Sequence, residues 1–259
     1  MTDKTKKVFH YHAHGLALSG LLTRPVSRSI EVQAASALPT IGGYGSARVE
    51  NFRLDHHIQF KAGYSHVAGS EQQKDGDEFH TTMVAAAVEG LNFLDVLTAD
   101  RVVLRLSGGH LYPDDESKFS FLGSTFENLK ICGHLVEVEL NDRLFTHLDT
   151  FAKVKKELET DKEFKKIAED PFRSGTPTKL REGSGVIHCS LVKKIRTNAP
   201  GVKVDGHAMD IPGFGRIYFA EAMLSVNKRT LTMLRFELGS PIEGSSIVSQ
   251  ASINGGHFP

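Results

Sequence analysis

The chain has 259 residues, with 31 Lys or Arg balanced by 31 Asp or Glu, so its formal net charge is zero. A neutral chain has no overall field to attract nucleic acid or an anionic membrane, and we expect neither as a partner. The apolar residues and the 24 glycines together make up an ordinary globular share, which excludes collagen-like and wholly disordered classes.

Three alternating histidines interrupt the first apolar segment, at His10, His12 and His14. The hydrophobic core of a secretory signal does not tolerate this pattern, and no run approaches the ~18 apolar residues of a transmembrane helix. The two cysteines, Cys132 and Cys189, are too few for a disulfide framework. We therefore expect a cytoplasmic protein.

Period-two alternation is clearest at residues 52–64, where most even positions are apolar, and it predicts one half-buried strand or two. A weaker alternation at 29–37 comes before it. Turn-forming residues at 39–45 lie between them, so we expect a hairpin there. The polar, glycine-containing segment 67–78 is predicted to be a surface loop.

Only one region has the helical period. Its apolar residues recur at spacings of three and four and predict a helix at 144–158; they are Leu144, Leu148, Phe151, Val154 and Leu158. Thr160 and Glu163 form a capping-box pair that predicts a second, short helix ending at Pro171. The lysines of this region alternate with acidic residues, which indicates a solvated surface rather than a nucleic-acid site.

Strand patterns make up most of the remaining chain, at residues 79–88, 101–106, 185–195, 202–211, 216–226, 230–238 and 246–253. The pairs Asp205-Gly206 and Asn227-Lys228 suit two-residue hairpin turns. We therefore predict a mainly β protein, an antiparallel sandwich or a solenoid-like stack of sheets. It forms a single domain over residues 1–259, with a helical pair inserted at 142–170.

Four short motifs resemble those of the bacterial choice-of-anchor P family of β domains. They are VEGLNFLDVLTAD at 88–100, FENLKICG at 126–133, GFGRIY at 213–218 and SIVSQA at 246–251. The resemblance covers residues 80–254 and implies a β-rich, non-catalytic module. This chain differs in its lysine-rich helical insertion and in lacking the secretory signal that is typical of that family.

The three N-terminal histidines are a candidate metal site. On a strand, His10, His12 and His14 project from one face with neighbours about 6.6 Å apart, and two imidazoles at that spacing can share one cation. Zinc, copper or non-haem iron suits such ligands. His56 is the candidate additional ligand, because the alternation places it on the apolar face of its own strand. The alternative is a solvated strand face that binds no metal.

Other residue groups predict less chemistry. Cys132 with His134, and His188 with Cys189, form a second candidate metal set, although their spacing favours structural burial. No catalytic motif is present. We therefore expect a non-catalytic binding or structural module with a histidine-ligated metal, and a protein partner or a second copy as its partner. The alternative is a small metal-dependent enzyme that uses the histidines named above.

Overall fold

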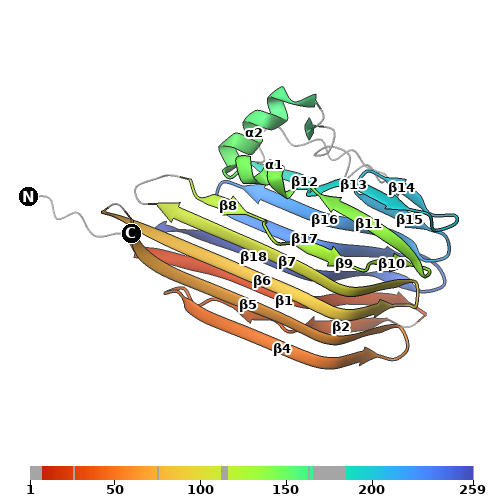
Figure 1. Ribbon diagram of the computed structural model, residues 1–259. Coiled ribbons are helices and arrows are strands. Elements are labelled where there is room, and N and C mark those ends of the chain that lie inside the picture. The colour runs from red at the N-terminus through yellow and green to blue at the C-terminus, as the bar shows by residue number, and fades with distance from the viewer. Residues whose placement is uncertain are drawn as a thin grey trace, which may run out of the picture.

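Two antiparallel nine-stranded sheets pack face to face in the computed structural model (Figure 1). The structure describes residues 8–25, 27–74, 76–111, 116–162, 164–165 and 185–258. The predicted mainly β class and the sandwich architecture are confirmed, and the helices form a small addition at one edge of the sandwich.

Sheet I has the strand order β14-β15-β16-β17-β18-β1-β2, with β12 beside β16 and β3 beside β1. Its strands are β1 (Val8–Arg24), β2 (Arg28–Gln33), β3 (Ser36–Ala37), β12 (Val186–Ser190), β14 (Lys203–Asp205), β15 (Ala208–Ile211), β16 (Gly215–Ser225), β17 (Lys228–Leu238) and β18 (Glu243–Phe258). The first and last strands, β1 and β18, pair along most of their length. This pairing brings residues from the two ends of the chain side by side (Figure 1).

Sheet II has the order β13-β11-β10-β7-β6-β5-β4, with β8 and β9 beside β7. Its strands are β4 (Gly43–Leu54), β5 (Ile58–Lys74), β6 (Asp77–Phe93), β7 (Leu97–Leu111), β8 (Lys118–Ser120), β9 (Thr125–Glu127), β10 (Lys130–Ile131), β11 (His134–Leu140) and β13 (Val192–Thr197). Consecutive hairpins join the strands from β4 to β7. Each strand therefore pairs with its neighbour in the sequence, and the alternating pattern of this region predicts strands without long-range information.

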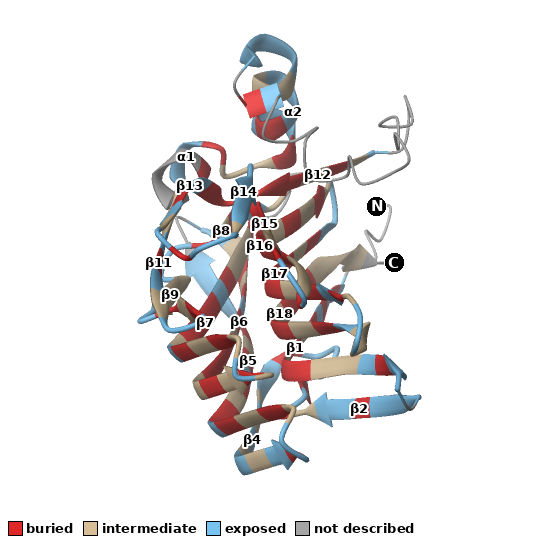
Figure 2. Cartoon of the chain, turned by 90° about the vertical axis from the view of Figure 1, so that its right-hand side faces the viewer, coloured by how far each residue is buried: buried red, intermediate tan, exposed pale blue. Residues whose placement is uncertain are grey.

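The core lies between the facing sides of the two sheets, where buried residues alternate with less buried ones along many of the strands (Figure 2). The sheets approach closely at Gly63 of β5, because a Cβ atom there would lie 2.9 Å from the Cβ of Ala17 on β1. A similar approach occurs at Gly69, which faces the ring of Tyr11. Strand β1 therefore runs opposite in direction to β5, which it faces across the core.

The predicted hairpin and the predicted loop were both wrong. Residues 39–45 do not turn a hairpin, because β3 pairs with β1 in sheet I whereas β4 pairs with β5 in sheet II. The predicted loop at 67–78 belongs largely to strands, since β5 continues to Lys74 and β6 begins at Asp77. Its residues are polar because this end of the hairpin extends into solvent while the backbone pairing continues.

The predicted continuous helix at 144–158 is divided into α1 (Asp142–His147) and α2 (Phe151–Thr160). The division is at Thr150, which has extended backbone angles (φ −130°, ψ 157°) and whose side chain accepts a hydrogen bond from the Lys153 backbone N–H. Thr150 is therefore an N-cap, and an N-cap residue cannot continue the preceding helix.

The predicted capping role of Thr160 was also wrong, because Thr160 is the last residue of α2. The next turn begins at Asp161, whose carboxylate accepts a hydrogen bond from the Phe164 backbone N–H at 3.0 Å. Glu163 and residues 166–184, which include the predicted helix end, lie outside the described residues.

Three residues of the predicted apolar stripe are buried where the helices meet the sandwich, Leu158 is half-buried, and the side chain of Leu144 lies outside the described residues. Leu148 and Phe151 are each 7% exposed and Val154 is fully buried, while the ring of Phe145 packs edge-on against Phe121. Within the described part of the chain, neither helix is long and apolar enough to cross a membrane.

Candidate metal centre

The three N-terminal histidines lie on the outer face of β1, as the alternation predicted. His10 and His12 are exposed, and His14 is half-buried. The rings of His12 and His14 are 6.1 Å apart and nearly perpendicular. Burial lowers the pKa of His14, and the neighbouring His12 and Lys228 lower it further. Lys228 gives this face a positive charge that disfavours a bound cation.

His56 does not lie on the apolar face of a strand, which was the reason for proposing it as a ligand. It is exposed in the turn between β4 and β5, where its ring lies 4.1 Å from that of His57. The even-position pattern continued through this turn, so sequence reasoning extended the strand across it. Tyr11, which lies between His10 and His12, faces Gly69 near the far end of β5. The turn that holds His56 comes directly before β5, so it lies roughly 35 Å along this strand from the N-terminal histidines. The structure does not bring His56 to them.

The cysteine and histidine set is also divided. Cys132 is exposed in the turn between β10 and β11 of sheet II, whereas Cys189 is buried in β12 of sheet I. Burial raises the pKa of the Cys189 thiol to about 12, so at neutral pH it is not the thiolate that a metal requires. The expected structural burial holds for Cys189 and not for Cys132.

A different group of histidines gathers between the sheets. His80 of β6 and His110 of β7 lie directly opposite each other in sheet II, and His257 of β18 lies opposite Phe9 of β1 in sheet I. Opposite residues of an antiparallel pair point to the same side of the sheet. The ring of His257 is 5.2 Å from that of His80 and 5.1 Å from that of His110. We call these three residues the histidine cluster.

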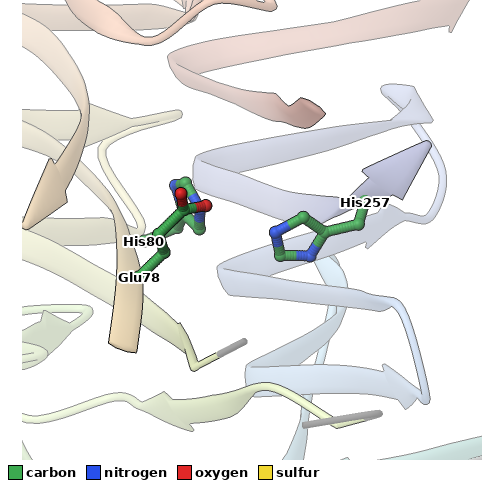
Figure 3. Close-up of side chains that lie close together, drawn as sticks. All are labelled: Glu78, His80 and His257. Carbon is green, nitrogen blue, oxygen red and sulfur yellow. The ribbon is translucent and has the colours of Figure 1, made fainter. Parts of the chain in front are cut away.

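Glu78 of β6 adds a carboxylate to this cluster. One carboxylate oxygen of Glu78 and one ring nitrogen each of His80 and His257 all lie within 4.8 Å of one another (Figure 3). The ligand atoms of a tetrahedral zinc ion are about 3.4 Å apart, so small side-chain rotations would allow all three to bind one ion. Two imidazoles with one carboxylate are the donor set of many zinc sites and of non-haem iron sites.

The buried phenol of Tyr11 orients His80. Its hydroxyl is 2.9 Å from His80 Nδ1, and both residues are buried. Burial raises the pKa of Tyr11, with a further contribution from the charge of Glu71, so the phenol stays neutral. When Nδ1 of His80 donates its proton to the phenol oxygen, Nε2 carries the lone pair that a metal needs. Hydrogen bonds of this kind commonly fix the tautomer of metal-binding histidines.

The aromatic surroundings hold the same ring in place. Phe9 stacks on His80 with 4.2 Å between ring centroids and 4° between planes. His80 is 3% exposed, while Glu78 and His257 are half-buried. An ion could therefore reach the group from the Glu78 and His257 side. Sequence reasoning missed this group because its members come from strands that are far apart in the chain.

A family model described as a domain of unknown function (DUF8256) matches residues 9–225. The chain belongs to the DUF8256 family. The matched region includes Glu78 and His80 but ends before His257. No curated protein and no solved structure matches the chain. Membership of DUF8256 therefore assigns no chemistry to the chain.

Proposed function

We propose that this DUF8256 protein is a non-catalytic, metal-binding β-sandwich module in which Glu78, His80 and His257 hold one transition-metal ion. The observation that carries the proposal is the convergence of these three ligand atoms within 4.8 Å. The support from Tyr11 and Phe9 on His80 agrees with it, since metal ligands need a fixed orientation.

A structural role for the ion follows from where its ligands lie. Glu78 and His80 belong to β6 of sheet II, and His257 belongs to β18 of sheet I. An ion bound to all three would cross-link the two sheets near the paired ends of β1 and β18. Binding to the folded state alone would then stabilise the fold.

The alternative, a small metal-dependent enzyme, has less support. The cavity bordered by His80 and His110 has a volume of about 20 Å³. This volume holds about one water molecule, so an organic substrate does not fit beside His80 on this side. We also place the ion at Glu78, His80 and His257 rather than at the N-terminal histidines, because Lys228 lies beside the latter.

Metal analysis of the untagged protein after dialysis tests the site. We expect about one zinc, iron or copper ion per chain in the wild type. The ion should be lost in Glu78→Gln and His257→Gln. His12→Gln is the matched control, because it removes an exposed imidazole of β1 and should leave the metal content unchanged.

Two results would refute this assignment. Stoichiometric metal that survives both His257→Gln and Glu78→Gln would place the ion elsewhere. Loss of the metal in His12→Gln with retention in His257→Gln would return the site to His10, His12 and His14.

We further propose that the partner is a second copy of the chain, which pairs through β4. This strand forms one edge of sheet II and is 12 residues long. Antiparallel pairing of two β4 strands about a two-fold axis at Val49 would place Arg48 of each copy opposite Glu50 of the other. Opposite charges that face each other across strands stabilise the pair. The apolar side chains of Ala47 and Val49, now partly exposed, would gain cover.

A charge-swap series tests this pairing by light scattering after size-exclusion chromatography. Arg48→Glu should convert the dimer to a monomer, because it places like charges opposite each other, and the double variant Arg48→Glu/Glu50→Arg should restore the dimer. Arg196→Glu is the control, since Arg196 is on β13 at the other edge of sheet II. A monomeric wild type, or a dimer that persists in Arg48→Glu, would refute the pairing.

We also propose that the protein is located in the cytoplasm. Both cysteines are free thiols, and Cys132 is exposed. Free exposed thiols persist most readily in a reducing compartment.

A further inference from the structure

Arg229 of β17 is an unusually buried cation. Only 2% of the residue is exposed, and its guanidinium lies 5.4 Å from the centre of the Phe119 ring. Its Nη2 donates a hydrogen bond to the Ser117 carbonyl oxygen at 2.9 Å. Its Nε atom is buried without a hydrogen-bond partner, and no carboxylate of the described residues forms an ion pair with it.

Its charge is poorly compensated. Burial lowers the pKa of Arg229 to about 10, and the more distant carboxylate of Glu116 opposes this change only in part. The side chain is still protonated at neutral pH. A buried charge without a close counter-ion is strongly unfavourable, so a bound anion would stabilise this arrangement.

A small cavity lies beside this side chain. Its polar lining residues are His80, Thr82, His110, Ser117, Arg229 and Asn254. Thr82, Ser117, Arg229 and Asn254 each have a side chain that can donate hydrogen bonds, and none of the lining residues is a carboxylate. The volume of about 20 Å³ accommodates one water molecule or a single-atom anion.

We propose that this cavity binds a small inorganic anion of about the size of chloride, with the Arg229 guanidinium as its counter-charge. The inference goes beyond the proposed metal site. His80 borders both sites, but Glu78 and His257 do not line the cavity, and Arg229 rather than a metal ligand supplies the charge. The anion completes the pairing of a cation that the fold has removed from water.

Thermal unfolding in chelator-treated protein tests the proposal without the metal. Gluconate is too large for the cavity, so replacing gluconate by chloride or bromide at constant ionic strength should raise the melting temperature of the wild type. The rise should reach roughly 5–10 °C when the anion exceeds its Kd about a hundredfold. The Arg229→Met variant should show no such rise in melting temperature. Arg196→Met, which removes an exposed arginine, is the matched control and should keep it.

Equal melting temperatures in chloride and gluconate would overturn the proposal, as would a chloride-dependent rise that persists in Arg229→Met. If Arg229→Met does not fold, bromide-soaked crystals of the wild type decide the matter. An anomalous peak within hydrogen-bonding distance of Arg229 Nε supports the site, and a cavity without such a peak rejects it.

Discussion

Glu221 of β16 is the centre of an ion-pair network on the outer face of sheet I. Arg235 of β17 donates two hydrogen bonds to its carboxylate, at 2.6 and 2.9 Å, and His207 Nε2 lies 3.3 Å from it. The Glu221 side chain is only 13% exposed. Arg235 also pairs with Glu237 and stacks over the Tyr218 ring at 3.7 Å.

The substitution Glu221→Gln removes the charge and keeps the shape. Each hydrogen bond to a charged group contributes about 1.5–3 kcal/mol, and glutamine retains one of the two acceptor oxygens. Arg235 keeps its contacts with Glu237 and Tyr218 in this variant. The loss of stability should therefore be smaller than the roughly 3–5 kcal/mol that breaking a fully buried ion pair costs. We expect about 2–3 kcal/mol of destabilisation, which corresponds to a fall in Tm of roughly 4–12 °C.

The pH dependence of the stability difference between wild type and Glu221→Gln shows whether the charge of Glu221 causes it. Burial opposes ionisation of Glu221, but the hydrogen bonds from Arg235 and His207 outweigh burial and hold its pKa below the ordinary value. A carboxylate with a lowered folded-state pKa stabilises the protein above its unfolded pKa of about 4.3 and loses this effect as pH falls through the folded pKa. The difference between wild type and Glu221→Gln should therefore be full near neutral pH and shrink in acid.

Urea denaturation across this pH range is the assay. Glu139→Gln is the matched control, because Glu139 pairs with Lys193 and Arg196 at an exposed position and its loss should hardly move the midpoint. A Glu221→Gln midpoint equal to that of the wild type at neutral pH would refute the reasoning. Denaturation curves that stay equally far apart at every pH would show that packing rather than charge causes the loss.

The remaining predictions concern packing and thiol chemistry. Leu148→Ala should destabilise the protein by roughly 2–5 kcal/mol in urea denaturation, because the side chain is buried, whereas the exposed control Lys155→Ala should have little effect. Gly63→Ala should be destabilising by roughly 1–3 kcal/mol, since its Cβ would approach Ala17 to 2.9 Å, and an unchanged midpoint would contradict the close sheet contact. A thiol reagent should modify Cys132 in the native protein and leave Cys189 unreacted until denaturant is added.

Local side-chain periodicity was sufficient to find most of the strands and their class. Residues 216–226 and 230–238 alternate because each strand has one face in the core, and the structure places β16 and β17 there. The burial of Leu148 and Phe151 was predictable for the same reason. Predictions failed where backbone pairing or capping overrode the pattern. The polar end of the β5–β6 hairpin and the N-cap at Thr150 are the two examples.

The candidate sites depended on contacts that periodicity does not describe. The alternation correctly placed His10, His12 and His14 on one face of β1, because which face a residue occupies is a property of the strand itself. The meeting of Glu78 and His80 with His257 required β1 to pair with β18 and sheet I to pack on sheet II. The same packing buries Arg229 beside its cavity. The sequence by itself determined most of the strands and the sides they expose, because alternation is local, whereas long-range pairing and sheet packing decided which side chains share a site.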